Sequence, residues 1–384
     1  MGRRITIQSG LKGRTWRWRG KVALTAVALG FVLYPITEPG HDVINSDWTP
    51  FATGAKIAMT NPTHLYDLDV QRRVQLEVTG GGQLITPGIH GILPFLAPAW
   101  VALLAVPFEA LGTELGGRLW VLFGLACLAL GLWLATRPRP IGAALPGFAA
   151  VPTALLLLNA QLDGIVALGL GAAFALWSRP FLAGLALGLT LMKPQLVLPV
   201  GLALIAGRRW RVLAGWAVAG VVLTASYLPL DPLWIEHFIA PAASTVQVIA
   251  REVDLAHMAV YLPRAAQTYG LVIVSLALSA VVVWLATRRR NETAVAASIL
   301  IAGGVLASPH ALPADLVLVS VALVMWSRAD AWDWVILSAG ALIAALAPAP
   351  VPVAVGLVVV GRLLLRQSLL PAPLQPTPQP VSTR

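Results

Sequence analysis

Several ionisable and amide side chains stand in short turns between apolar blocks, and their types suit binding or acid–base chemistry. Lys193, in the sequence Met-Lys-Pro-Gln, is the only lysine after Lys56. An ionisable residue within an apolar stretch is costly, so it is a functional candidate by default. A lone cation facing a membrane cavity suits a phosphate, and Gln161 and Gln195 should face the same cavity. Lys193 could instead snorkel to the interface as a structural anchor.

Asp47 provides a carboxylate a short distance beyond the first apolar block, where it should lie near the outer membrane surface. Two interpretations stay open for it. The structural one is a helix N-cap, a position that Asp fills well and that Ser46 fills equally well. The functional one is a reactive carboxylate, for which Asp42, beside His41, is a nearby competitor.

The segment Tyr66-Asp67-Leu68-Asp69 contains an Asp-x-Asp pair. Such a pair holds a divalent metal against a diphosphate in enzymes that use nucleotide sugars, but that chemistry needs a soluble Rossmann-like domain, which this sequence does not suggest. The pattern therefore favours a turn followed by a helix cap. The single cysteine, Cys127, leaves no disulfide framework or zinc site, and we predict no metal ligands and no cofactor.

His310 lies in Ser-Pro-His, where the Ser-Pro pair breaks a helix and exposes backbone groups to a ligand. It is either a functional residue or an interfacial loop histidine. Asp315, further on, favours a helix cap over a catalytic role. Arg251 and Arg264 belong to a polar loop and either clamp a phosphate in bidentate fashion or are ordinary solvated charges.

The elements that must position these residues are membrane helices. Hydrophobic residues make up 58% of the 384 residues and charged residues only 11%, against roughly 25% charged residues in soluble proteins. Apolar blocks near the roughly 20 residues that cross a bilayer recur along the chain. The composition thus predicts an all-α polytopic membrane protein, in which some of the shorter blocks are broken or re-entrant, as happens around substrate cavities.

The distribution of charged residues along the chain indicates how the chain is organised. Residues 1–21 carry seven Lys/Arg and should form a basic cytoplasmic N-terminus, followed by a retained signal anchor at about 22–36. The polar segment 37–88 holds six of the 17 acidic residues and should be extracytoplasmic, with interfacial helices at about 48–59 and 67–78. The membrane domain extends over 22–367, and the proline-rich tail 368–384 should be disordered.

Twelve further apolar blocks follow the first. They lie at about 89–111, 119–136, 141–158, 164–176, 181–192, 196–206, 212–228, 271–287, 294–307, 316–326, 334–347 and 351–365, with a second extracytoplasmic loop at 229–268. Placing the short basic turns inside makes the turns with Gln161, Lys193 and His310 face outside. Two full crossings between 89 and 136 would put Arg137 outside, so either one of those segments is re-entrant or the orientation assigned to the first segments is wrong.

The net charge of +10 does not indicate a nucleic-acid partner. The basic residues stand singly or in short clusters between apolar blocks, which is the positive-inside pattern of membrane proteins rather than a binding face. The expected partners are the lipid bilayer of the cell membrane and substrates that reach the extracytoplasmic face.

Taken in order, these pieces resemble glycosyltransferase family 87, the polyprenyl-phosphate-mannose-dependent mannosyltransferases of the GT-C superfamily. The motifs are Asp-Trp-Thr-Pro-Phe-Ala-Thr-Gly-Ala from Asp47, Leu65-Tyr66-Asp67, the proline-bearing segment 93–98, the turn Ala160-Gln161, a Gly-Leu-rich stretch from Gly184 to Lys193-Pro194-Gln195, the basic 208–211, and Ser308-Pro309-His310 with Asp315. Two departures are the absence of Tyr-Pro-Pro near 88–91 and Ala160 in place of glycine.

The resemblance implies a GT-C-type bundle of about 11–13 transmembrane or re-entrant helices with a long first extracytoplasmic loop. It implies inverting, metal-independent transfer of a sugar, mannose, from a polyprenyl-phosphate donor to a glycolipid or glycan acceptor. Asp47 would be the base and His310 the second catalytic residue. Substrate and phosphate contacts would come from the remaining candidates, Lys193, Gln195, Gln161, Arg251, Arg264 and Tyr66.

Two alternatives remain on the sequence alone. An arabinofuranosyl or other pentosyl transferase of the same superfamily would share these motifs. A transporter or flippase of lipid-linked substrates would also place polar groups in mid-membrane breaks, but it would usually show two similar halves, and we find no internal repeat.

Overall fold

The chain folds entirely into helices and connecting loops over the residues that the computed structural model describes, 6–82, 92–244 and 252–369. Within these ranges there are eighteen α-helices and six short 3-10 helices, and no β-strand. The prediction of an all-α polytopic membrane protein is confirmed.

The helices in chain order begin at the basic N-terminal segment. The first half comprises α1 (Thr6–Thr37), α2 (Gly40–Ile44), α3 (Trp48–Thr60), η1 (Pro62–His64), α4 (Leu68–Val78), α5 (Ala99–Glu109), α6 (Thr113–Thr136), η2 (Ile141–Ala143), α7 (Leu145–Phe148), α8 (Val151–Leu158), α9 (Asp163–Ala175), α10 (Pro180–Leu187) and η3 (Gly188–Met192). The second half comprises η4 (Pro194–Val197), α11 (Leu198–Ala206), α12 (Trp210–Tyr227), α13 (Trp234–Ser244), η5 (Leu255–Tyr261), α14 (Arg264–Thr287), α15 (Thr293–Ala307), η6 (Pro313–Leu316), α16 (Val317–Met325), α17 (Ala331–Leu346) and α18 (Val351–Leu369).

Five helical segments are long and apolar enough to cross a bilayer. They are Trp18–Thr37, Thr113–Thr136, Trp210–Tyr227, Tyr269–Thr287 and Val351–Leu369. Seven shorter apolar helical stretches of 10–17 residues accompany them. At least one predicted block is broken: 141–158 divides into η2, α7 and α8, with Pro146 and Pro152 at the starts of the latter two helices. Proline lacks the N–H that a helix interior needs, so it begins helices rather than continuing them.

The two segments between 89 and 136, where the sequence predicted one re-entrant segment, differ in length. Helix α5 has only 11 residues and is therefore about 16 Å long, roughly half of the 30 Å hydrocarbon core. Helix α6 has 24 residues and is long enough to cross. Of the two helices, α5 is the one shorter than the hydrocarbon core, and it packs on α3 and α6.

Two boundaries differ from the sequence prediction. Helix α1 begins at Thr6, well before the predicted start at 22, because no proline interrupts the basic segment. Helix α14 begins at Arg264, so the predicted loop 229–268 ends earlier and contains α13 and η5. Helices are present at both segments predicted to be interfacial, as α3 and α4, and their position in the interface stays a prediction. The predicted tail lies almost wholly outside the described residues.

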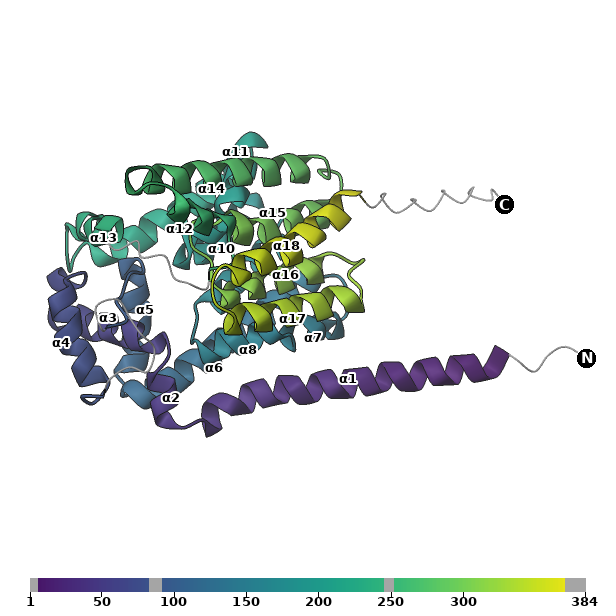
Figure 1. Ribbon diagram of the computed structural model, residues 1–384, viewed down its shortest axis with the longest axis horizontal. Coiled ribbons are helices and arrows are strands. Elements are labelled where there is room, and N and C mark those ends of the chain that lie inside the picture. The colour runs from purple at the N-terminus through teal and green to yellow at the C-terminus, as the bar shows by residue number, and fades with distance from the viewer. Residues whose placement is uncertain (1–5, 83–91, 245–251, 370–384) are drawn as a thin grey trace, which may run out of the picture.

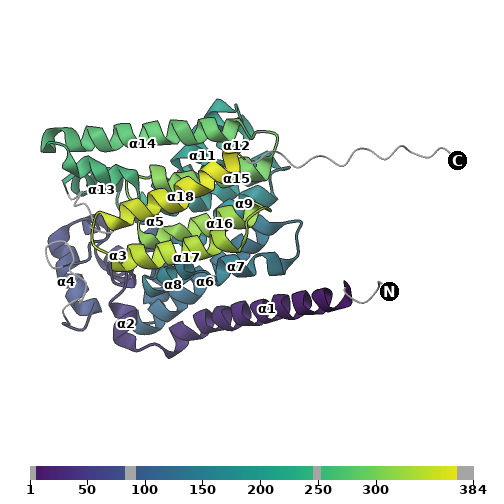
Figure 2. The same cartoon turned by 45° about the vertical axis from the view of Figure 1, so that its right-hand side comes forward.

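The helices are arranged so that the polar segments gather at one end. Figures 1 and 2 both show α2, α3, α4 and α13 at one end of the bundle, and the start of α1 and the end of α18 at the other. The first extracytoplasmic segment predicted from sequence, with α2 to α4, therefore shares an end with the second, which contains α13.

Helix α4 anchors the extended segment that leads into α5. Its residues Gln71 and Gln75 are one turn apart and face Phe95 and Leu93. The N–H of Phe95 donates to Gln71 Oε1 at 2.8 Å, and the N–H of Leu93 donates to Gln75 Oε1 at 2.9 Å. Each glutamine amide also donates to the carbonyl oxygen of the same partner. These four bonds satisfy backbone groups that would otherwise be costly to bury.

Helices α6 and α9 pack through glycines at seven-residue spacing. Gly124 and Gly131 of α6 face Gly164 and Gly171 of α9, and a Cβ added at either α9 glycine would overlap the carbonyl oxygen of its α6 partner. Small residues let membrane helix backbones approach closely, because van der Waals packing rather than the hydrophobic effect holds them together. This contact fixes the N-terminal end of α9, which carries Asp163.

We expect Gly171→Ala to lower stability by about 1–3 kcal/mol, the usual cost of overpacking. Gly361→Ala in α18 is the matched control, since an added Cβ there meets nothing within 4 Å and alanine favours helix. The measurement is the free energy of unfolding in detergent or lipid. Equal stabilities of the two variants would show that α6 and α9 do not approach this closely.

Candidate active site

The carboxylate of Asp47 is held by a residue far away in the chain rather than by its own helix. Asp47 precedes α3 in the N-cap position, but its side chain makes no capping hydrogen bond. Ser46 Oγ accepts from the N–H of Trp48 at 3.2 Å instead. The amide of Gln161 donates to Asp47 Oδ2. The N-cap interpretation of Asp47 is therefore wrong, because Ser46 takes the local bond and leaves the carboxylate for a tertiary partner.

Gln161 is positioned by the way α8 ends. The N–H of Gln161 donates to the carbonyl of Leu156 at 3.0 Å, and the N–H of Ala160 donates to that of Leu157 at 3.1 Å. These bonds form a Schellman motif, which needs a left-handed residue at its turn. Ala160 is that residue, with a φ of 49°. The structure thus explains why glycine suits this turn, since glycine enters the left-handed region without strain.

Lys193 lies in a buried ion cluster with two carboxylates. Its Nζ is 2.9 Å from Asp163 Oδ2 and 2.5 Å from Asp315 Oδ1. The side chains of Asp163 and Asp315 are 0% and 2% exposed, and that of Lys193 is 13% exposed. Buried charges are tolerated when they are paired and hydrogen-bonded. The cluster joins the start of α9, the break between η3 and η4, and η6.

Asp315 also forms the helix cap that its sequence position predicted. Its Oδ2 accepts from the N–H of Leu312 at 2.7 Å, which stabilises the start of η6. The same carboxylate therefore forms a local cap and a tertiary ion pair.

The long polar loop reaches His310 through Glu252. Glu252 Oε1 lies 2.8 Å from His310 Nδ1, and Glu252 Oε2 lies 2.9 Å from His257 Nδ1. The Glu252 and His257 side chains are buried, whereas His310 keeps 42% of its side chain exposed. The Nδ1 edge of the His310 ring is thus bound by Glu252, while part of the ring remains exposed.

The electrostatic surroundings of Asp47 link it to the other ionisable groups. Burial raises the pKa of Asp47 to about 6, the neighbouring charges of Lys193 and His310 lower it, and Asp315 raises it. A carboxyl with a pKa near neutrality can accept a proton and release it again under physiological conditions. The structure therefore brings Asp47, Gln161, Lys193 and His310 into one site.

Tyr66 and Gln195 make no contact with Asp47 or His310 among the hydrogen bonds of the described residues, and the side chains of Arg251 and Arg264 lie outside those residues. Tyr66 is buried, donates its hydroxyl to the carbonyl of Ala97 at 2.9 Å and packs on Phe95 and Phe238. Gln195 is half-buried in η4. Arg251 lies outside the described residues, as does the side chain of Arg264. Asp67 caps α4 by accepting from Asp69 and Val70, as the Asp-x-Asp interpretation predicted.

Sequence reasoning did not select Asp163 and Glu252 as site residues. Asp163 carries a usable signal, since it is the single acidic residue between Glu114 and Asp231, in a stretch of apolar blocks. The argument from intramembrane cost that selected Lys193 applies equally to it. Glu252 has no such signal, because it stands among other charges of a polar loop.

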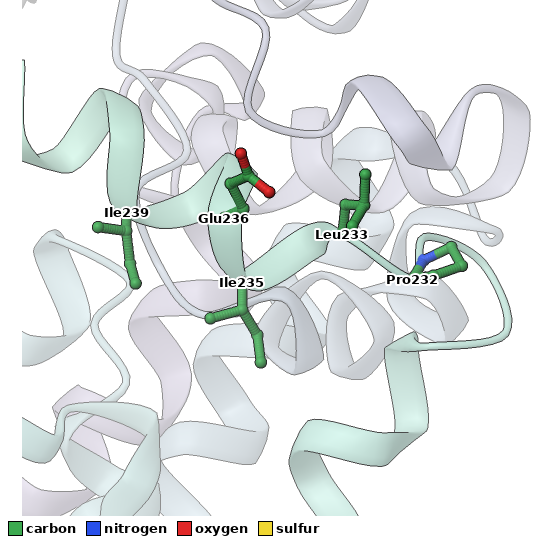
Figure 3. A pocket seen from close by; sticks show the side chains of 5 residues that line it. All are labelled: Pro232, Leu233, Ile235, Glu236 and Ile239. Carbon is green, nitrogen blue, oxygen red and sulfur yellow. The ribbon is translucent and has the colours of Figure 1, made fainter.

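An open groove of about 520 Å³ lies on the same polar end of the molecule. Figure 3 shows its lining on α13 and the preceding turn, Pro232, Leu233, Ile235, Glu236 and Ile239. None of the five belongs to the Asp47 site. The described residues also contain no group of three or more His, Cys, Asp or Glu side chains arranged to hold a metal ion.

The fold and the site define a membrane-embedded protein in which helix ends and loops assemble carboxylates and cations at one end of the bundle. A sequence model of glycosyltransferase family 87 matches residues 95–309, more than half of the chain. The chain belongs to this family and is a glycosyltransferase. Comparisons with curated proteins and with solved structures found no match.

The family match covers only part of the candidate site. Gln161, Lys193 and Glu252 lie within the matched residues, whereas Asp47 precedes them and His310 directly follows them. The contacts of Asp47 with Gln161 and of His310 with Glu252 tie both residues to the matched part.

We expect Lys193→Met to destabilise the protein by about 3–5 kcal/mol, because it leaves two buried carboxylates unpaired. Lys56→Met is the matched control, since Lys56 pairs with Glu77 at 3.0 Å near the surface, where such a pair contributes about 0–1 kcal/mol. The measurement is the free energy of unfolding of both variants in detergent. Small and similar losses of stability in the two variants would contradict the buried ion cluster.

Proposed function

We propose that this glycosyltransferase moves mannose from a polyprenyl-phosphate donor to a hydroxyl of a glycolipid or glycan acceptor at the extracytoplasmic face, with inversion. Family membership supports glycosyl transfer, and the long apolar helices support a lipid-linked donor. The observation that carries the proposal is the position of Asp47. Its carboxylate is withdrawn from helix capping and held by Gln161 beside Lys193 and His310.

Asp47 is the proposed general base. A base in this reaction takes the proton of the acceptor hydroxyl as the oxygen attacks the sugar. Gln161 donates to one carboxylate oxygen, Oδ2, which orients the group and leaves the other oxygen for the acceptor. Because the pKa of Asp47 is raised to about 6, its carboxylate is a stronger base than an exposed aspartate and is still ionised at neutral pH.

Lys193 and His310 are the proposed partners of the leaving phosphate. An ammonium has three N–H donors, and Asp163 and Asp315 engage two of them. The third can donate to a phosphate oxygen, while the two carboxylates fix the direction of the lysine side chain. His310 is open on the edge that Glu252 does not hold. Gln195, Arg251, Arg264 and Tyr66 remain predictions as substrate contacts.

The reaction forms one bond and breaks one. The acceptor oxygen attacks the anomeric carbon from the face opposite the phosphate, and the C–O bond to the phosphate breaks with its electron pair on the leaving group. The hydroxyl proton passes to Asp47, and the product has inverted configuration. The leaving group is a phosphate monoester whose growing negative charge is stabilised by nearby cations. The scheme therefore uses no metal ion and no cofactor.

We place the enzyme in the cell membrane with its N-terminus in the cytoplasm. The seven Lys/Arg of the first 21 residues support that orientation. The start of α1 and the end of α18 share one end of the bundle, opposite to α2, α3 and α13 (Figure 2). The site then opens to the extracytoplasmic side, where a lipid-linked donor and a glycolipid acceptor share the outer leaflet.

Asp47→Asn should reduce transfer by roughly 10²–10⁴-fold, the usual contribution of a general base. The assay uses protein in lipid, radiolabelled polyprenyl-phosphate-mannose and a membrane glycolipid extract, with label followed into a larger glycolipid. Asp42→Asn is the matched control, because Asp42 pairs with the exposed His41 at 3.1 Å.

Three outcomes of this assay would change the proposal. Transfer that survives Asp47→Asn but not Asp42→Asn would move the base to Asp42. Transfer from polyprenyl-phosphate-arabinofuranose alone would change the sugar. No transfer from any lipid-linked sugar would overturn the proposed reaction.

Transfer should fall as the pH drops through about 6, because protonation of Asp47 removes the base. The raised pKa places this loss well above the ordinary range of aspartate, and the rate should drop about tenfold per pH unit below it. The measurement is kcat/KM for the acceptor between about pH 5 and about pH 7. A constant rate over this range would contradict Asp47 as a base with a raised pKa.

A further inference from the structure

Glu252 bridges two histidines from within the folded protein. One carboxylate oxygen lies 2.8 Å from His310 Nδ1 and the other lies 2.9 Å from His257 Nδ1. The Glu252 side chain is only 6% exposed. A buried carboxylate that binds two side chains at once has little rotational freedom, so it offers His310 a fixed partner.

The backbone around Glu252 is fastened to the turn that carries His310. The N–H of Val253 donates to the carbonyl of Ala311 at 2.8 Å. In return, the N–H of Ala311 donates to Asp254 Oδ2 at 2.8 Å, and Asp254 Oδ1 accepts from the N–H of His257 at 2.9 Å. Two bonds thus connect the loop and the Ser-Pro-His turn next to the bond between Glu252 and His310, and the third fixes Asp254 within the loop.

This arrangement decides which nitrogen of His310 is available. An ionised carboxylate can only accept hydrogen bonds, so Nδ1 of His310 must carry a proton. The other nitrogen, Nε2, is then the one left for a substrate. The exposure of the His310 ring, 42% against 6% for Glu252, agrees with a ring held on one edge and open on the other.

We propose that Glu252 is a positioning residue that holds His310 as a protonated, oriented donor, with its Nε2–H directed at the phosphate of the lipid-linked sugar. This inference rests on the proposed function, because it assigns His310 to the leaving phosphate. Glu252 itself touches no substrate and acts only through His310. His257 binds Glu252, and Asp254 binds the Ser-Pro-His turn, so together they hold Glu252 and the turn in fixed relative positions.

The charges around His310 support this assignment. Burial opposes protonation, but the hydrogen bond and charge of Glu252, with the charge of Asp315, outweigh it and raise the pKa of His310 above its usual value. Lys193 acts in the opposite direction. Asp47 and Asp254 also interact electrostatically with His310. Since the active form is protonated, activity that depends on His310 is present below its pKa and is lost as the pH rises through it.

The test compares Glu252→Gln with Glu236→Gln, the same substitution at an exposed position of the same polar loop (Figure 3). We expect Glu252→Gln to lower kcat by roughly 10- to 100-fold, the range in which orienting partners of a histidine act, with little change in KM. The alkaline limb of the pH–rate profile should move to lower pH, because the neutral amide no longer stabilises the histidine cation. Glu236→Gln should leave both unchanged.

A double-mutant cycle with His310→Gln separates positioning from general structural damage. If Glu252 acts through His310, Glu252→Gln should have almost no further effect on transfer in the His310→Gln background. An equal loss in both backgrounds, or an alkaline limb that stays in place, would overturn the proposal.

A measurement without substrate keeps this test independent of the reaction. NMR of histidine-labelled protein, with the His310 signal identified by its loss in His310→Gln, reports the pKa of His310 directly. That pKa should fall in Glu252→Gln and stay constant in Glu236→Gln. If it falls but no lipid-linked sugar is transferred by the wild-type protein, the positioning by Glu252 holds and the proposed function fails. An unchanged His310 pKa overturns the inference whatever the activity.

Discussion

The pairing of Lys193 with Asp163 and Asp315 is the constraint on which the site depends. None of these three side chains can ionise in an apolar interior alone, and each of the three contributing turns breaks a run of apolar helix. Pairing and hydrogen bonding offset part of the cost of burial, and loss of one partner leaves an uncompensated buried charge, so the three turns are stabilised by meeting. The ion cluster therefore determines where α9, η4 and η6 begin relative to one another. Gln161, two residues before Asp163, is carried into place with it and binds Asp47.

The two polar loops each supply a residue to the site beside this cluster. The first loop supplies Asp47, and its helices α3 and α4 pack against α5 and the segment anchored by Gln71 and Gln75. The second loop supplies Glu252, which binds His310. A base and a cation thus come from segments more than 200 residues apart in the chain.

Particular residues show how far sequence reasoning reached. Composition and block length predicted the helical membrane fold. The conflict of charges around Arg137 predicted a re-entrant segment before it, and this stays a prediction, with the 11-residue α5 the shorter of the two helices. The turns with Gln161, Lys193 and His310 were predicted to share one side, and they meet in one site. The competing N-cap interpretation of Asp47 could not be decided locally, since Ser46 fits the same position. Lys193 was assigned to a phosphate without its two carboxylate partners, which lie 30 and 122 residues away.

By itself, the sequence determined the class of protein, the order of its helices and the turns in which polar groups lie, because hydrocarbon thickness and the cost of buried charge act on short stretches of chain. Tertiary structure alone decided the partners. Only folding pairs Gln161 with Asp47, gives Lys193 its two carboxylates and sets Glu252 against His310. A buried charged side chain requires a partner, but which partner it meets depends on how the helices pack.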